Sequence, residues 1–478
     1  MDSNLLRKFL SFSYGSWVGL VIGILTTIIT TRILTPEQFG KASMFHLATN
    51  MLTIFAIFGT DQAFVRFFYE EVDHKRGGLL YNCMRIPVVV TGLIVAVVLA
   101  FYKQLTSFLF GSPSLLLAVM LSIGVASNVL FRFAHLVVRM KQEGHLFSVF
   151  SIAAKVSDFV LIIILFMLLG SRYEILIYSA TLTPMFLFII LVYIESDYWN
   201  LRNFGRHDLM HSQIDIVSYA YPLVLTSLIS WLFTSFDKLA LKRWSTFEEI
   251  GVYGAASRII ALLVALQGSF STFWAPVCYE HYEQSPKDTK FFEVISRIVA
   301  IVMLSLAILT IMFKDVIALV LGSSFREAAY IMPFLVFMPV LYTISETTVI
   351  GINFAKKPKW HILIAATACL VNIVGNSLLV PKMGAKGAAI ATAVSYFVFF
   401  VLRTHISLRY YPINLEFGKL YSILFLIFIL ALFTTFTNSK MVSFTGGLAT
   451  FCLLIIVFGS DVKALTMKLK KGPKIIEK

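Results

Sequence analysis

Ionisable side chains interrupt several of the long apolar runs in this sequence. Lys155 and Asp158 stand three residues apart in one run, so on a helix they share a face. Arg258 lies deep inside another run, with no acidic residue beside it in the sequence. Charges at membrane depth are costly and usually functional, and a planar guanidinium suits the oxygens of a phosphate. The alternative is structural: Lys155 and Asp158 neutralise each other, and Arg258 pairs with Asp158 or Glu346.

Four further charges are candidates of two kinds. Arg85 and Arg132 would hold an anionic substrate, although basic residues near a membrane face are usually anchors that reach the headgroups. The acids Glu346 and Asp61 would either bind a coupling cation, H⁺ or Na⁺, or pair with arginines. For all four residues, the functional and the structural alternative stay open at this point.

Polar amides and small residues also follow helical spacing. Asn372 and Asn376 lie four residues apart, where they would hydrogen-bond a sugar or cross-link two helices. Gly15, Gly19 and Gly23 form a ladder of small residues in the first apolar run. Such a ladder favours close helix packing, and it would also permit bending during a conformational change.

The composition identifies the setting of these residues as a membrane. Of 478 residues, 58% are hydrophobic and 14% are charged, whereas soluble proteins carry about a quarter charged residues. The formal net charge of +14 is explained by basic cytoplasmic loops near anionic lipids, or by an anionic substrate, and needs no nucleic acid partner. Four cysteines lie singly in apolar runs, so neither disulfides, a metal site nor a cofactor is expected.

The apolar runs are long enough to cross a bilayer as helices, which takes about 20 residues each. They predict an all-α polytopic membrane protein with about fourteen transmembrane helices. Basic residues gather at the span ends on the side that holds both termini, which predicts that both termini are cytoplasmic. The predicted spans cover residues 9–31, 38–64, 80–101, 114–138, 146–169, 174–194, 214–236, 249–274, 294–321, 328–354, 360–380, 387–408, 418–437 and 441–459.

One short phrase occurs twice in the chain. RILTPEQFG at 32–40 matches RWSTFEEIG at 243–251 with an offset of 211 residues. Thr35 and Thr246 are each followed three residues later by Gln or Glu, which is the pattern of a capping box at a helix start. Both phrases are expected on the same side of the membrane, so they indicate a parallel repeat of two halves.

The repeat predicts how the chain is organised. Two six-helix lobes are expected to be related by a pseudo-two-fold axis along the membrane normal, and the last two helices have no counterpart. The predicted parts are an N-terminal six-helix lobe (1–197), a cytoplasmic linker (198–213), a C-terminal six-helix lobe (214–411), two additional helices (412–460) and a basic cytoplasmic tail (461–478).

These motifs resemble those of a known family. RILTPEQFG after a polar first span, IGVYGAASRI at 250–259 and WAP at 274–276 are similar to signatures of polysaccharide-unit flippases. Those flippases belong to the multidrug, oligosaccharidyl-lipid and polysaccharide exporter superfamily. The resemblance implies two lobes around a central cavity and alternating access. Fourteen helices are more typical of lipid II flippases, in which the added pair helps to form a groove for a lipid tail.

The resemblance implies a flippase, not an enzyme. It would translocate a polyprenyl-diphosphate-linked oligosaccharide across the cytoplasmic membrane, with membrane lipids, a coupling ion and other polysaccharide-assembly proteins as partners. The alternatives are a lipid II-type flippase, a drug or cation antiporter of the same fold, a membrane enzyme and a non-transporting scaffold. The sequence holds no P-loop for nucleotide hydrolysis and no large outer loop with a catalytic cluster.

Overall fold

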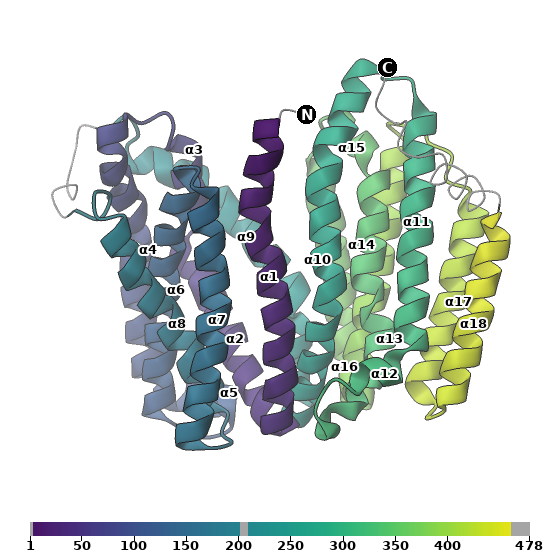
Figure 1. Ribbon diagram of the computed structural model, residues 1–478, viewed down its shortest axis with the longest axis horizontal. Coiled ribbons are helices and arrows are strands. Elements are labelled where there is room, and N and C mark those ends of the chain that lie inside the picture. Colours follow the sequence, from purple (N-terminus) through teal and green to yellow (C-terminus); the bar gives the residue numbers. More distant parts are fainter. Residues whose placement is uncertain (1–2, 201–208, 460–478) are drawn as a thin grey trace. The chain divides into compact units, whose positions relative to one another are not determined.

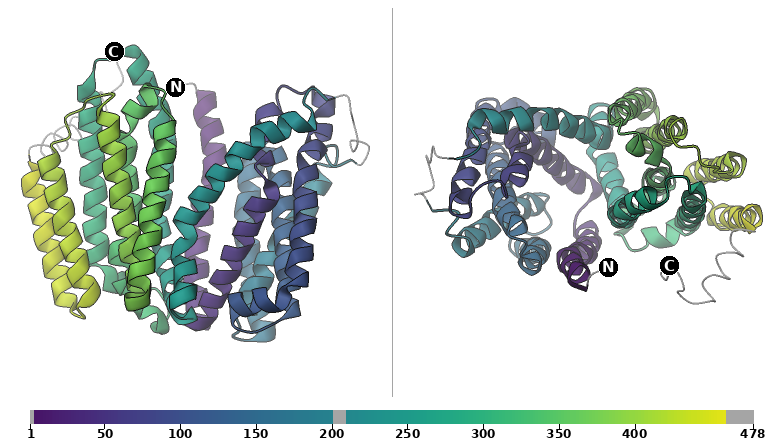
Figure 2. Two further views of the ribbon diagram at one scale, coloured as in Figure 1. Left: turned by 180° about the vertical axis from the view of Figure 1, so that it is seen from behind. Right: turned by 90° about the horizontal axis from the view of Figure 1, so that it is seen from above.

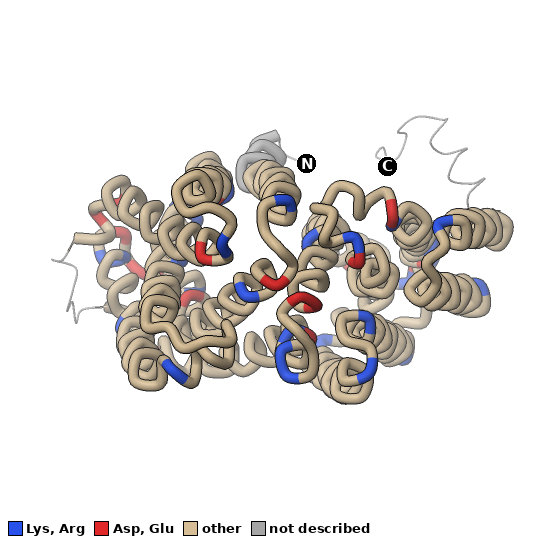
Figure 3. Tube along the Cα trace, turned by 90° about the horizontal axis from the view of Figure 1, so that it is seen from below, with Lys and Arg blue, Asp and Glu red and all other residues tan. Residues whose placement is uncertain are grey.

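The computed structural model describes residues 3–200 and 209–459, and these residues are almost entirely helical. The chain divides into two compact units, Met1–Lys238 (unit 1) and Leu239–Lys478 (unit 2). The division falls within a helix, later than the predicted linker at 198–213. The predicted lobe boundaries stay predictions, and the basic tail and most of that linker lie outside the described residues. Figure 3 shows that most of the trace is uncharged and that the charged residues form short segments on it.

The helices begin and end close to the predicted limits. Those of unit 1 are α1 (Ser3–Ile33), α2 (Pro36–Ile57), α3 (Thr60–Phe67), η1 (Asp73–Lys75), α4 (Arg76–Ala100), α5 (Tyr102–Phe110), α6 (Leu115–Met140), α7 (Gly144–Leu169), α8 (Glu174–Ile194) and α9 (Gln213–Trp244), which runs on across the division (Figure 1). Those of unit 2 are α10 (Phe247–Gln284), α11 (Thr289–Met312), α12 (Lys314–Ala318), η3 (Ser323–Tyr330), α13 (Met332–Leu335), α14 (Phe337–Thr348), α15 (Ile350–Phe354), α16 (Lys359–Leu408), α17 (Phe417–Phe436) and α18 (Lys440–Val457).

The number of spans agrees with the predicted number once each bent helix pair is counted as one span and the hairpin described below is counted as two. Eleven of the described helices are long and apolar enough to cross a membrane, and two bent pairs raise the number to as many as 13. One bent pair is α2 with α3, at 51°, and the other is η3 with α13 and α14, at 49°. The chain is therefore a multi-pass membrane protein. One of its long helices consists of two spans.

That helix is α16, which contains a reversal. Gly384 has φ 53° and ψ −131°, which is not helical. Asn372 Nδ2 donates to Ser395 Oγ at 3.5 Å, although 23 residues of straight helix would separate them by about 35 Å. A Cβ on Gly387 would lie 2.6 Å from the carbonyl oxygen of Leu379, so the two halves also touch near the turn. The helix is therefore an antiparallel hairpin, which confirms the two spans predicted at 360–380 and 387–408. The described residues thus hold up to fourteen candidate spans.

The first copy of the repeated phrase is a helix start that also reaches a distant turn. Thr35 Oγ1 accepts from Gln38 N at 3.3 Å, and Gln38 Oε1 accepts from Thr35 N at 3.1 Å. The predicted capping box is therefore confirmed. Gln38 Nε2 also donates to the carbonyl oxygen of Ser171 at 3.1 Å, which ties the start of α2 to the turn between α7 and α8.

The second copy repeats this contact with different chemistry. Thr246 Oγ1 accepts from Glu249 N at 3.3 Å, as a cap should. The Glu249 carboxylate accepts a hydrogen bond from the backbone N–H of Ala385. It also occupies the space that a Cβ on Gly384 would need. Each phrase thus joins a helix start to a turn between later helices of its own unit, which is a structural role.

The glycine ladder of α1 packs on α7. The backbone N–H of Gly15 donates to Ser148 Oγ at 3.3 Å, and a Cβ there would lie 2.7 Å from Ser148 Cα. A Cβ on Gly19 would meet Lys155 Cγ at 3.4 Å, whereas one on Gly23 would meet nothing within 4 Å. Helix packing therefore explains two of the three glycines.

Two further features position the elements of each unit. In unit 1, Phe64 of α3 and Phe133 of α6 are fully buried with Leu80 of α4, so the short α3 is held against longer helices. In unit 2, α17 and α18 lie side by side and pack on α11 (yellow in Figures 1 and 2). The burial of α3 matters for the site, because this helix carries one of the predicted acids.

Candidate functional site

Two adjoining pockets open among the helices of unit 1, and together they form what we call the unit 1 groove. The first, of about 210 Å³, is lined by α2, α6, α7 and α8, and the second, of about 490 Å³, by α2, α3, α6 and α9. Asn50, Asn128 and Phe131 line both pockets, so the two are continuous. The groove thus combines amide groups with an aromatic ring inside a bundle of apolar helices.

The first pocket contains the predicted pair on α7. Lys155 and Asp158 both line it, with Lys155 exposed and Asp158 half-buried. The stem of Lys155 lies against Gly19 of α1, where the absence of a side chain leaves room for it. None of the described residues forms an ion pair with Lys155 within 4 Å. Its ammonium group is therefore available to an anion in the pocket.

A break in the α2–α3 span builds the second pocket. Phe58 and Gly59 have φ values of 53° and 70°, so the helix stops and starts again at an angle. Gly59 is required here because a Cβ would lie 2.7 Å from the carbonyl oxygen of Ala220 on α9. The break brings Asp61 into the first turn of α3, where it is 5% exposed. Broken spans are typical of transporter binding sites, because the freed backbone needs polar partners.

Asp61 forms an ion pair with Arg132 of α6. Arg132 Nη2 and Nε donate to Asp61 Oδ2 at 2.8 and 3.3 Å. The backbone N–H of Gln62 donates to Oδ1 at 2.9 Å, and Gln62 Nε2 donates to Oδ2 at 3.0 Å. The side chain of Arg132 is 55% exposed, whereas that of Asp61 is 7% exposed. The base therefore faces the pocket and the acid is withdrawn from it.

A stack of rings forms one wall of the second pocket. His135 lies between Phe131 and Phe147, with ring centroids 5.5 and 4.1 Å apart and planes within 15° of parallel. The His135 Nε2 atom lies 3.1 Å from the carbonyl oxygen of Phe147, which fixes the orientation of the ring. Phe131 and His135 thus give the second pocket an aromatic lining that Phe147 supports from behind.

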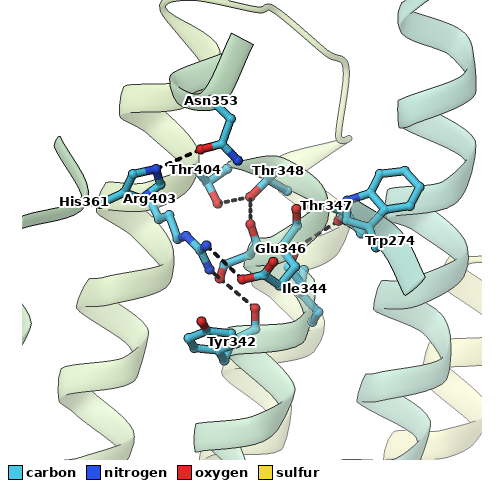
Figure 4. A network of polar contacts seen from close by, with 11 residues as sticks. Trp274, Tyr342, Ile344, Glu346, Thr347, Thr348, Asn353, His361, Arg403 and Thr404 are labelled. Carbon is cyan, nitrogen blue, oxygen red and sulfur yellow. Dashed lines mark hydrogen bonds and ion pairs between the residues drawn. The ribbon is translucent and has the colours of Figure 1, made fainter. Parts of the chain in front are cut away.

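Unit 2 holds a second intramembrane ion pair, shown in Figure 4. Arg403 Nη2 donates to Glu346 Oε1 at 2.8 Å, and Arg403 Nη1 donates to Ser345 Oγ at 2.7 Å. The guanidinium also lies 5.1 and 5.3 Å from the ring centroids of Tyr342 and Phe399. The side chains of Arg403 and Glu346 are only 9% and 16% exposed. This pair is enclosed by its neighbours rather than open to a pocket.

Further hydrogen bonds around that pair join α10, α14, α15 and α16. Trp274 Nε1 donates to the carbonyl oxygen of Glu346 at 3.2 Å, and the hydroxyls of Thr348 and Thr404 lie 2.7 Å apart (Figure 4). The backbone N–H of Gly351 donates to Ser407 Oγ at 2.8 Å. The network therefore holds four helices of unit 2 together.

Comparison with known proteins now identifies the family. The model of the family described as "polysaccharide biosynthesis protein" matches residues 5–280, more than half of the chain. The chain belongs to the polysaccharide biosynthesis protein family. It is 19% identical over 87% of its length to a probable low-salt glycan biosynthesis flippase, Agl15, of Haloferax volcanii, and it covers 86% of that protein.

Solved structures share the fold of this polysaccharide biosynthesis family member. The lipid II flippase MurJ, in an inward closed conformation, matches with a TM-score of 0.67 and 15% identity, over 94% of this chain and 99% of that one. An inward-facing multidrug resistance MATE transporter matches with a TM-score of 0.64 and 13% identity, over 85% and 96%. The predicted all-α polytopic fold class is confirmed.

In this family member, the structure brings four of the nine predicted residues into one groove. These are Lys155, Asp158, Arg132 and Asp61. For Asp61 the alternative of pairing with an arginine is what is observed. For Glu346 the same holds, but its partner Arg403 was missed by the sequence analysis. The available signal was an arginine within the predicted span 387–408.

The other predicted residues lie apart from this groove. Arg85 is exposed on α4 and lines neither pocket. Arg258 is half-buried on α10 in unit 2. Asn372 and Asn376 are fully buried, and Asn376 Nδ2 donates to Asn372 Oδ1 at 3.2 Å. With the hydrogen bond from Asn372 to Ser395, these contacts form the helix cross-link that the sequence analysis gave as the alternative to sugar binding. Substrate roles for these four residues stay predictions.

Proposed function

We propose that this protein is a flippase that carries a polyprenyl-diphosphate-linked oligosaccharide across the cytoplasmic membrane during synthesis of a surface polysaccharide. Membership of the polysaccharide biosynthesis family and the name of the archaeal relative support this. The observation that carries the proposal is the polarity of the unit 1 groove. Its two bases, Arg132 and Lys155, are exposed, whereas Asp61 is buried and Asp158 is half-buried. By number the charges balance, but the groove presents cations.

The groove suits the chemistry of such a substrate. An exposed arginine and a lysine bind the oxygens of a diphosphate, the arginine through two donors at once. The amides of Asn50 and Asn128 can exchange hydrogen bonds with sugar hydroxyls beside the rings of Phe131 and His135. The prenyl chain stays in the bilayer, because removing it would cost about 0.8 kcal/mol per CH₂ group. Arg258 and Arg85 are proposed as further contacts for the anionic group during translocation.

We further propose alternating access with both termini in the cytoplasm. The chain carries no P-loop, so the energy comes from an ion gradient or from removal of the product. Asp61 and Glu346 are the candidate acids for coupling to H⁺ or Na⁺. Of these, Asp61 borders an open pocket and Glu346 does not.

The test replaces both exposed bases of the groove. The Arg132→Gln, Lys155→Gln double variant is expected to lower export of the glycan at least tenfold in cells that depend on this protein. Arg172→Gln serves as the matched control, because Arg172 is an exposed base in the α7–α8 turn and lines neither pocket. Membrane levels and detergent melting show whether each variant folds. Normal export by a folded double variant would contradict the assignment.

The drug-antiporter alternative predicts that an acid, rather than a base, faces the pocket. A carrier of organic cations needs an acid that faces its pocket, and here the most buried charge of the groove is an acid. Resistance to ethidium that the wild type confers and the double variant retains would favour that alternative. Transfer of purified lipid II across vesicle membranes would instead favour the peptidoglycan precursor as substrate.

A further inference from the structure

We infer that Asp61 is a counter-ion latch for the substrate's diphosphate. It holds Arg132 when the groove is empty, releases it to the diphosphate when the substrate enters, and takes it back when the substrate leaves. This rests on the proposed function, since it needs a diphosphate-bearing substrate. It assigns to Asp61 a positioning role that acts through Arg132.

The geometry of the pair leaves Arg132 able to change partners. Its Nε and Nη2 atoms share a single acceptor, Asp61 Oδ2, rather than binding both carboxylate oxygens in parallel. Its Nη1 atom makes no hydrogen bond to any of the described residues. More than half of the side chain is exposed. Because an exposed charge keeps much of its hydration, the ion pair is weaker than a fully enclosed one.

Asp61 remains stabilised after Arg132 has left. The backbone N–H of Gln62 donates to Oδ1, and the side-chain amide of Gln62 donates to Oδ2. Asp61 also lies in the first turn of α3, where the positive end of the helix dipole favours a carboxylate. Both oxygens therefore keep a donor, and losing the arginine does not strand a buried charge.

The two roles of Asp61 have opposite effects on the substrate. While it holds Arg132, it competes with the diphosphate for the same donors. Once the diphosphate is bound, the nearby carboxylate repels it and offers Arg132 a partner for the return step. Neutralising Asp61 should therefore strengthen binding and slow release. If Asp61 had a purely structural role, its neutralisation would instead weaken substrate binding.

Glu346 provides a matched comparison within the same chain. It also pairs with an arginine at membrane depth, but Arg403 is 9% exposed and holds Ser345 as well. The Glu346 carboxylate lines neither pocket of the groove. Its neutralisation should disturb unit 2 without strengthening the binding of any anion in unit 1.

The experiment measures binding to the purified full-length protein in nanodiscs of neutral lipid. Farnesyl diphosphate is the probe, with inorganic pyrophosphate and nanodiscs containing phosphatidylglycerol as separate arms. Asp61→Asn is expected to lower the Kd for farnesyl diphosphate about threefold to tenfold, and Arg132→Gln to raise it at least tenfold. Glu416→Gln, at a partly exposed ion pair of unit 2 that lines neither pocket, should leave it within twofold. If phosphatidylglycerol competes with the probe and inorganic pyrophosphate does not, the site binds a lipid headgroup rather than a diphosphate, which overturns the inference.

Export in cells separates the inference from the proposed function. Asp61→Asn should export more slowly than the wild type although it binds more tightly. Weaker or equal binding by Asp61→Asn, in a wild type that exports glycan, overturns the latch and leaves the flippase in place. A wild type that neither binds the probe nor exports glycan overturns both. If Asp61→Asn fails to fold, Asp61→Ser carries the same expectation.

Discussion

The two intramembrane ion pairs have the same chemistry but different surroundings. In unit 1, Arg132 is 55% exposed to a pocket beside Asp61. In unit 2, Arg403 is 9% exposed, and Ser345, Tyr342 and Phe399 surround it together with Glu346. Figure 4 shows Tyr342 and Glu346 beside Arg403. The exposure of the base, rather than the presence of the pair, decides which role is possible. An exposed base can exchange its partner for a ligand, whereas an enclosed base holds helices together.

The largest effect on stability is expected where the pair is enclosed. Glu346→Gln leaves the charge of Arg403 buried without compensation, which should cost about 3–5 kcal/mol of unfolding free energy. Thermal unfolding in detergent measures this as a marked fall in Tm. The double variant Glu346→Leu, Arg403→Met removes both charges and should recover most of the loss. An unchanged Tm for Glu346→Gln would show that the two pairs do not differ.

A smaller loss is expected at the exposed pair. In Asp61→Asn, Arg132 can turn to water and the amide oxygen can still accept from Gln62, so the loss should be about 1 kcal/mol. The measurement is the same melting experiment, run beside Glu346→Gln. A loss as large as that of Glu346→Gln would contradict the comparison, because it would make Asp61 a structural clamp.

The smallest effect is expected at a third pair, between Arg297 and Glu416, whose side chains are 23% and 28% exposed. A hydrogen bond from Lys419, with the charge of Arg297, holds the pKa of Glu416 below its usual value, against the opposing effect of burial. Because this pKa is lower in the folded state, the stabilisation is complete above about pH 4.3 and is lost as the pH falls through the folded-state pKa.

Melting of the wild type and of Glu416→Gln at several pH values tests this third pair. The difference in Tm between them should be small at pH 7, equivalent to less than about 1 kcal/mol, because the pair is partly exposed. It should shrink further as the medium is acidified below the ordinary glutamate pKa. A difference that grows on acidification would reverse the sign and rule out the proposed cause.

Much of the architecture could be predicted because its signals are local. Apolar runs long enough to cross a bilayer correspond to the observed helices, including the two halves of α16. The Thr35 capping box was visible because its partner lies three residues away. Residues such as Lys155 and Asp158 could be selected as candidates because a charge inside an apolar run is costly, and this can be seen without knowing its neighbours in space.

The pairings could not be predicted, because they join distant positions. Asp61 and Arg132 are separated by 71 residues, and Arg403 and Glu346 by 57. Glu249 looked like the second half of a capping box, but its carboxylate binds the turn at Ala385, 136 residues away. No spacing rule covers such contacts, since packing of whole helices creates them.

The sequence by itself determined that this chain crosses a membrane many times, that it repeats a helix-start phrase, and which charges need a reason. These follow from hydrophobic transfer and from hydrogen bonds within a few residues. Only the tertiary structure decided which charges share a groove and which are enclosed. The break at Phe58–Gly59 turns Asp61 toward α6, and the approach of α14 to α16 buries Arg403. The role of each charge depends on how much water its partner helices leave around it.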